Sequence, residues 1–412
     1  MTGTLLSVEL ARDLLLKEFT SLPGEEVSLR DGLARVLARD LVANQDLPPF
    51  SNSSMDGFAL RAEDVRGASR RNPVRLQVVL DVPAGYSPPA SLPAGVAARV
   101  MTGAPIPPGA DCVVPVEQTD LSAMQPALPG EIGILAEMRP GENIRPGGFD
   151  IQAGERILAR GTRLRPQEIA LLASLGQVSV QVTQRPRIAI VSTGSELVPV
   201  GRPLRAGEIF ESNSLMLEAL VTESGGQPIS LGIAPDDAAE IGLRFDSALD
   251  QGADLILSSA GVSVGAYDYV RQVVEKRGRL SFWRVNLRPG RPLAFGRYRG
   301  VPVMGLPGNP VSSFVTFELF ARPAITVLLG GVPRPRPRVT ARLTEDLESD
   351  GRETYLRGQS QWDLGQWRVR LSGNQGSSAL SALVRANSLI RLPAGTTRVP
   401  AGSPVEVWLL AD

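Results

Sequence analysis

Four carboxylates stand in the loops that follow short apolar runs in the middle of the 412-residue chain: Glu196, Asp236, Asp237 and Asp268. The sequence contains no histidine, so a metal ion held here would have oxygen ligands, and Mg²⁺ is the cation that such a set favours. We therefore predict a Mg²⁺ site formed by Glu196, Asp236 and Asp268. An equally good interpretation makes Asp236 the cap of the helix expected after it, because Asp is a favoured N-cap residue.

Three loops rich in glycine, hydroxyl groups and backbone N–H donors follow three of the apolar runs. If those runs are parallel strands, the loops meet at the carboxyl edge of one sheet, where ligands bind. Backbone N–H groups near helix starts attract anions, although each loop alone could be an ordinary turn. None fits the P-loop or dinucleotide fingerprint, yet together they favour a phosphorylated ligand. The loops cover residues 192–196, 258–265 and 305–310 and include Thr193, Gly194, Ser263, Pro307 and Pro310.

An arginine-rich turn is the fourth candidate for anion binding. Arg284, Arg288 and Arg291 lie within residues 282–292 beside a Pro-Gly pair. Guanidinium groups bind pyrophosphate or carboxylate in a bidentate geometry, through two parallel hydrogen bonds. An exposed turn whose arginines face water is the alternative.

The segment 48–58 is unusual in a different way. It places polar residues, among them Asp56, between Phe50 and Phe58, a pattern that a plain strand does not need. The Asp56-Gly57 pair alone would indicate only a turn.

The composition excludes several classes of protein. With 43% hydrophobic and 21% charged residues the chain is typical of a soluble globular protein. The 43 basic and 43 acidic residues balance, which argues against nucleic-acid and anionic-membrane binding. The absence of histidine excludes Ser-His and Cys-His nucleophile pairs and His-ligated zinc. Because Cys112 has no second cysteine to pair with and no signal pattern opens the chain, we expect a cytoplasmic protein.

The apolar spacing predicts the elements that position these residues. An amphipathic helix is expected over 8–19, and short strands separated by Pro and Gly between 47 and 139 predict small antiparallel sheets or a barrel. From residue 188 onward strands alternate with helices, which predicts a doubly wound βα sheet that ends in a long helix over 311–329. A Pro-Arg linker at 333–338 precedes a small β domain.

The expected architecture is therefore α/β plus all-β, in a multidomain chain. We predict an elongated helix/β linker domain, a β-rich insert domain that carries Asp56, a doubly wound α/β domain and a C-terminal, barrel-like β domain. In that order the predicted bounds are 1–46 with 140–183, 47–139, 184–331 and 332–412.

These residues together resemble the molybdopterin molybdenumtransferases, the bacterial MoeA family, and the C-terminal domain of gephyrin. The matching motifs appear in the family's order over nearly the whole chain. They lie at residues 49–59, 101–105, 109–111, 143–150, 192–197, 212–213, 261–268, 288–292, 306–310, 351–352, 357–358 and 376–387.

The resemblance implies a function and an assembly. It implies insertion of molybdate into adenylylated molybdopterin with Mg²⁺, with release of AMP and the molybdenum cofactor. It implies an elongated homodimer whose site lies between the molybdopterin-binding type βα domain of one protomer and the Asp56-bearing domain of the other. A molybdopterin adenylyltransferase is the expected partner enzyme.

The resemblance also assigns site residues by position. The functional carboxylates it implies are Asp56, Asp150, Glu196, Asp268 and either Asp236 or Asp237. The other site positions it implies are Thr102, Arg288, Arg291, Pro307, Pro310, Arg357 and Ser377. Two alternatives stay open at this point: a paralogue that inserts tungstate, and a non-catalytic scaffold like gephyrin, which has no need to gather five carboxylates.

Overall fold

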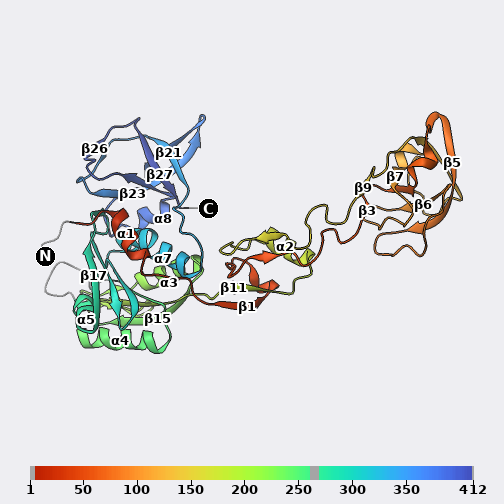
Figure 1. Cartoon of the computed structure of the whole chain (residues 1–412). Helices are drawn as coiled ribbons and strands as arrows, with labels where there is room; N and C mark the ends of the chain where they lie inside the picture. Colours follow the sequence, from red (N-terminus) through yellow and green to blue (C-terminus); the bar gives the residue numbers. More distant parts are fainter. Residues whose placement is uncertain (1–4, 260–268, 411–412) are drawn as a thin grey trace.

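The computed structural model describes residues 5–259 and 269–410, which form an elongated molecule (Figure 1). A β-rich unit lies at one end, and a helix-covered sheet lies beside a second β-rich unit at the other end. Narrow paired strands connect the two ends. The multidomain, elongated α/β plus all-β architecture predicted from the sequence is confirmed.

Six strands form the βα sheet in the order β15-β12-β16-β20-β19-β17. The first four run parallel, as the alternation of strands and helices predicts, whereas β19 and β17 extend the sheet as antiparallel strands. The bounds are β12 Arg187–Thr193, β15 Gln227–Ala234, β16 Leu255–Ser259, β17 Gly278–Arg284, β19 Pro292–Tyr298 and β20 Val301–Leu306. The sequence pattern missed β19 because Pro292 and Gly296, residues that are rare in strands, interrupt its apolar run.

Helices cover both faces of this sheet. Ile188 and Ile190 of β12 pack in one apolar cluster with α1, α3 and the α6–α7 segment. Ala189 and Val191 face the opposite side and pack with α4 and α5. The bounds are α1 Val8–Leu16, α3 Asn213–Glu223, α4 Ala238–Asp250, α5 Tyr269–Arg277, α6 Pro310–Thr316 and α7 Arg322–Leu328.

The long helix expected over 311–329 is a composite. A π-helical turn, Phe317–Ala321, separates α6 from α7. By length and composition alone the segment Pro310–Leu328 could cross a membrane, but 78% of it is buried inside the protein. It is the core helix of the βα unit, and its N-terminus opens beside the carboxyl end of β20.

The chain leaves the βα unit after α1 and returns to it at β12. On the way out and back, short strands pair in the narrow middle of the molecule, with α2 beside them (Figure 1). The bounds are β1 Gly24–Ser28, β2 Leu41–Val42, β10 Arg156–Leu158, β11 Ser179–Thr183 and α2 Pro166–Ser174.

The far end is a five-stranded sheet in the order β7-β4-β6-β5-β8, preceded by the pair β3–β9. Only β5 and β6 run parallel, so the sheet is mostly antiparallel, as predicted. The buried Cys112 lies in its core. The bounds are β3 Asn52–Ser53, β4 Gly57–Leu60, β5 Ser69–Val82, β6 Val96–Val100, β7 Cys112–Pro115, β8 Glu131–Ala136 and β9 Ile144–Arg145.

The C-terminal unit is a closed barrel. Strands pair in the order β23-β24-β21-β27-β25, and β25 pairs back with β23, which confirms the barrel-like β domain predicted there. The short strand β18 pairs with β23, so the arginine turn is attached to the barrel. The bounds are β18 Leu287–Arg288, β21 Arg338–Leu343, β23 Glu353–Asp363, β24 Gln366–Leu371, β25 Ser388–Leu392, β27 Pro404–Leu409 and α8 Leu380–Arg385.

Candidate functional site

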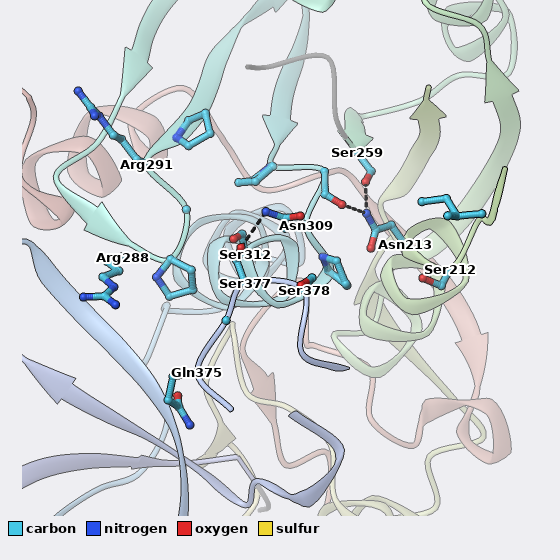
Figure 2. A pocket seen from close by; sticks show the side chains of 18 of the residues that line it. Ser212, Asn213, Ser259, Arg288, Arg291, Asn309, Ser312, Gln375, Ser377 and Ser378 are labelled. Atoms are coloured by element: carbon cyan, nitrogen blue, oxygen red, sulfur yellow. Dashed lines mark hydrogen bonds between the residues drawn. The ribbon is translucent and has the colours of Figure 1, made fainter. Parts of the chain in front are cut away.

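A cavity of about 840 Å³ lies between the carboxyl edge of the βα sheet and the C-terminal barrel. The loops after β12 and β20, the last residue of β16, the arginine turn and the strand β23 all contribute to its lining. It brings together eight of the residues predicted from the sequence: Thr193, Glu196, Arg288, Arg291, Pro307, Pro310, Arg357 and Ser377. Figure 2 views this cavity with α6 nearly end-on, its first turn surrounded by serine and asparagine side chains.

Arg357 is the most unusual group in the cavity. It is wholly buried, at 0% exposure. Its Nη2 donates to the carbonyl oxygens of Asn374, at 3.3 Å, and Gly376, at 3.1 Å. Its Nε and Nη1 have no hydrogen-bond partner, and no described carboxylate lies within ion-pair distance. Burial, together with the nearby charge of Arg288, lowers the pKa of Arg357 to about 10.

The turn before β19 carries two more cations toward the cavity. Arg288 Nη1 lies 3.9 Å from Asp350 Oδ2, too far for a hydrogen bond. Asp350 is instead held by the guanidinium of Arg352, whose hydrogen bonds, together with the charge of Arg288, outweigh the effect of burial and lower the pKa of Asp350 to about 2. Arg291 is exposed and makes no ion pair with any described residue. At Gly290, φ is +113° and a Cβ would lie 2.6 Å from Thr316, so the close packing of this turn on α6 requires glycine.

The loop after β12 holds the carboxylates of the βα edge. Thr193 ends β12, and a Cβ on Gly194 would lie 2.7 Å from the Glu196 carboxylate, which therefore folds back over this loop. Asp236, from the loop after β15, accepts a hydrogen bond of 3.3 Å from the Ser195 N–H. Asp237 accepts hydrogen bonds from the N–H groups of Ala239 and Glu240, the second and third residues of α4, and is its N-cap. The structure thus separates the two neighbours: Asp237 caps, and Asp236 faces the loop of the site.

The first turn of α6 joins the βα unit to the barrel. Pro310 is its first residue, where a missing N–H costs nothing. Asn309 donates to Ser377 Oγ at 2.8 Å, and the Val311 N–H donates to the Ser377 carbonyl at 3.1 Å. The predicted residues Pro307, Pro310 and Ser377 therefore lie in one connected wall of the cavity.

Two polar residues of this cavity were not assigned to a site from the sequence, although one of them, Asn213, lies in the matching motif 212–213. Glu211 is a buried carboxylate that accepts from Ser192 Oγ at 2.7 Å and from the Ser214 N–H at 2.8 Å. Asn213 begins α3 and donates hydrogen bonds to Ser259, the last residue of β16, and to Gly308 in the loop after β20. Their signal was a Glu-Ser-Asn triplet directly before a predicted helix, which by itself indicates only a cap.

Three predicted residues lie at the other end of the chain. Thr102 donates to Asp56 Oδ1 from both its N–H and its hydroxyl, each at 2.7 Å, and these bonds lower the pKa of Asp56. Asp150 is exposed next to the strand pair β3–β9, which Figure 1 places far from the βα unit. One chain therefore does not bring Asp56, Thr102 and Asp150 to the cavity.

The predicted Mg²⁺ set is described only in part. Asp268 and Ser263 lie outside the described residues, and within the described ranges no three His, Cys, Asp or Glu side chains gather closely enough to hold a metal. Glu196 and Asp236 nevertheless extend from loops that meet through Ser195, at the edge where the cavity opens. One or two carboxylates plus phosphate oxygens and water is the usual Mg²⁺ environment, so this donor set fits the ion.

The fold and the cavity define a multidomain protein with an arginine-lined cavity at the edge of a doubly wound sheet. Three family models match the chain in order. They are the MoeA N-terminal region (domain I and II) over residues 6–176, a probable molybdopterin binding domain over residues 189–327, and the MoeA C-terminal region (domain IV) over residues 340–410.

Relatives match over almost the full length. Molybdopterin molybdenumtransferase 2 of Mycobacterium tuberculosis is 40% identical over 391 residues, which cover 93% of this chain and 94% of that protein. The Haemophilus influenzae molybdopterin molybdenumtransferase is 35% identical and covers 98% of both chains. Among solved structures, a molybdopterin biosynthesis MoeA protein of Pyrococcus horikoshii matches with a TM-score of 0.83 at 33% identity, over 98% of this chain and 100% of that chain.

The chain belongs to the MoeA family of molybdopterin molybdenumtransferases. The predicted family is thereby confirmed, and so is the predicted class of function, a transferase of molybdenum cofactor biosynthesis.

Proposed function

We propose that the cavity binds adenylylated molybdopterin and that the enzyme inserts molybdate into it, with cleavage of the pyrophosphate and release of AMP. The observation that carries this proposal is the buried guanidinium of Arg357 with two unpaired N–H donors. A buried charge without a partner is costly, so such a site is built for an anion that the ligand supplies. Arg288 and Arg291 add positive charge to the same cavity.

The residues have clear roles in such a reaction. Cleavage of a pyrophosphate concentrates negative charge on the departing phosphate oxygen, and preorganised donors stabilise that charge. Arg288, Arg291 and Arg357 supply fixed positive charge, while the Ser377 hydroxyl adds a neutral donor. Molybdate is a tetrahedral dianion, so the same donors suit it as the incoming substrate.

Glu196 and Asp236, with Asp268 as a third carboxylate, would hold Mg²⁺ at the sheet edge. When bound there, the ion would neutralise charge on the phosphate oxygens of the substrate. Asp236 already interacts with Ser195, so the two described carboxylates belong to adjoining loops.

The assembly we propose is a homodimer with shared sites. Asp56 and Asp150 lie at the end of the molecule opposite the cavity, so only a second copy can place them there. Phe50, Met55 and Phe149, which flank them in sequence, are 46%, 40% and 69% exposed. Exposed large apolar side chains around a polar site are typical of a surface that a partner covers. Light scattering of the purified chain should give twice the protomer mass of 43.9 kDa.

The substrate is already adenylylated, so a molybdopterin adenylyltransferase must supply it, and we propose that enzyme as the partner. We also propose a cytoplasmic location, which the single buried thiol of Cys112 supports. Fractionation of cells that carry a tagged chain tests the location. Co-purification of the adenylyltransferase tests the partner.

AMP release from adenylylated molybdopterin is the decisive assay. Purified protein with Mg²⁺ should release AMP and form active cofactor when molybdate is added. Tungstate in place of molybdate distinguishes the two oxyanions. A folded dimer that binds the substrate without releasing AMP would contradict the proposed reaction and favour a scaffold.

A further inference from the structure

The cavity has a second end, whose free polar atom is an acceptor. Asn213 lines the cavity, and its amide nitrogen donates to Ser259 Oγ at 2.7 Å and to the Gly308 carbonyl at 2.6 Å (Figure 2). Because a carbonyl oxygen can only accept, the atom that faces Gly308 has to be the amide nitrogen. Asn213 Oδ1 is therefore turned away from both bonds, and it is buried without a partner.

The surroundings of Asn213 show why a ligand has to satisfy this oxygen. The neighbouring Glu211 carboxylate is already occupied by hydrogen bonds from Ser192 and Ser214. Thr193 Oγ1, in a side chain that is 1% exposed, also lacks a partner. Buried carbonyl oxygens are nearly always hydrogen-bonded, because leaving one unpaired forfeits its hydration.

The two ends of the cavity thus have opposite requirements. The free polar atoms of Arg357 are donors and call for an anion. The free oxygen of Asn213 is an acceptor and calls for an N–H or O–H group. A ligand that satisfies both carries an anionic group at one position and a hydrogen-bond donor at another.

We propose that Asn213 Oδ1 accepts a hydrogen bond from an amino group on a heterocycle of the bound substrate and so determines which ring the site accepts. This inference rests on the proposed function, because the substrate assigned there carries two such amines. One is the 2-amino group of the pterin, and the other is the 6-amino group of the adenine. The shared chemistry is an aromatic amine that donates to a buried amide oxygen.

Binding of matched probes to the full chain distinguishes the two rings. Calorimetry compares 6-hydroxymethylpterin with its 2-dimethylamino analogue, and AMP with N6,N6-dimethyl-AMP. In one of the two pairs the amino form should bind roughly 10- to 100-fold more tightly, because the analogue leaves the buried oxygen unpaired. If the wild-type chain binds both members of each pair with equal affinity, the proposal is overturned, and no substituted protein is needed for this result.

Two substitutions separate the oxygen from the nitrogen of the amide. Asn213→Asp keeps an acceptor oxygen but loses the donors to Ser259 and Gly308, whereas Asn213→Leu loses both functions. The preference for the amino probe should survive in the Asp variant and disappear in the Leu variant. Loss of the preference in both variants would mean that Asn213 has only a structural role, through its hydrogen bonds to Ser259 and Gly308. Asn387→Leu is the control, because both of its amide atoms pair with the Ser360 backbone on the barrel.

The binding readout also separates this inference from the proposed reaction. A preference for the amino probe in protein that releases no AMP would support the contact and contradict the reaction. Equal binding of the probes by protein that does release AMP would overturn the contact alone.

Discussion

Arg357 links stability to function at the scale of one residue. Replacement by methionine removes two hydrogen bonds to backbone carbonyls and also removes an unpaired buried charge, two effects of opposite sign. We expect the ligand-free free energy of unfolding to change by less than about 1 kcal/mol, while AMP release falls by about 100-fold or more. Thermal melting with and without molybdate, together with the AMP assay, checks this.

Arg342→Met is the matched control for that variant. Arg342 is an exposed arginine of the same barrel that donates to the Gly402 carbonyl and does not line the cavity. Its loss should leave both the anion-induced rise in Tm and AMP release intact. An Arg357→Met protein that molybdate still stabilises would contradict the assigned role.

The neighbours Asp236 and Asp237 should behave in opposite ways. Asp237→Ala removes the cap of α4 and should lower the free energy of unfolding by about 1 kcal/mol, with AMP release unchanged. Asp236→Asn should leave stability unchanged and raise the Mg²⁺ concentration needed for half-maximal AMP release. Titration of Mg²⁺ against rate checks the pair, and identical profiles for the two variants would exclude the assignment.

Thr102 should set the acid limit of activity through Asp56. Its two hydrogen bonds favour the ionised carboxylate and lower the Asp56 pKa, so a function of that carboxylate is lost only as pH falls through the lowered value. Thr102→Val removes the hydroxyl bond and raises the pKa. The acid limb of the AMP-release profile should therefore move to higher pH. Thr102→Ser keeps the hydroxyl, so the acid limb of its AMP-release profile should lie at the same pH as in the wild-type protein.

At the scale of an element, the arginine turn depends on its contact with α6. Gly290→Ala would place a Cβ 2.6 Å from Thr316 at a backbone φ of +113°. Strain and overpacking together should destabilise the protein by about 2–4 kcal/mol and weaken anion binding, because Arg288 and Arg291 flank the displaced residue. Gly85→Ala is the control, because Gly85 also has a positive φ but no atom lies near the added Cβ. Its destabilisation measures the backbone strain without the packing clash. Equal destabilisation by both would rule out the packing argument.

Some of the helices and strands could be predicted from their own residues, and others could not. The alternation of apolar strands and helices predicted the parallel sheet, because the hydrophobic periodicity of each strand or helix is a property of its own residues. The antiparallel strand β19 was missed because Pro292 and Gly296 interrupt its apolar run, and the π-turn Phe317–Ala321 inside the long helix was not predicted either. The sheet edge nevertheless placed the predicted Thr193 and Pro307 in one cavity.

At the scale of the whole molecule, shared sites predict complementation between defective copies. Asp56→Asn and Arg357→Met should each be inactive alone. When the two chains are refolded together, mixed dimers contain one site with both residues intact, and about a quarter of wild-type activity should return. Mixing Arg357→Met with Asp236→Asn should give no more activity than the two variants measured separately, because both defects lie on the cavity side. No recovery in the first mixture would contradict the shared site.

The family and the class of fold can be predicted from the residues alone, and so can the arginine- and glycine-rich loops as candidates for anion binding. Motif order, strand and helix periods and the arginine and glycine loops are all local properties, so they can be read without coordinates. Three further features depend on the folded structure: Asp237 rather than Asp236 caps α4, Arg357 is buried with its Nε and Nη1 unpaired, and Asn213 Oδ1 is buried without a hydrogen bond. Burial and hydrogen-bond satisfaction depend on what every other segment places around an atom, and no local pattern records that.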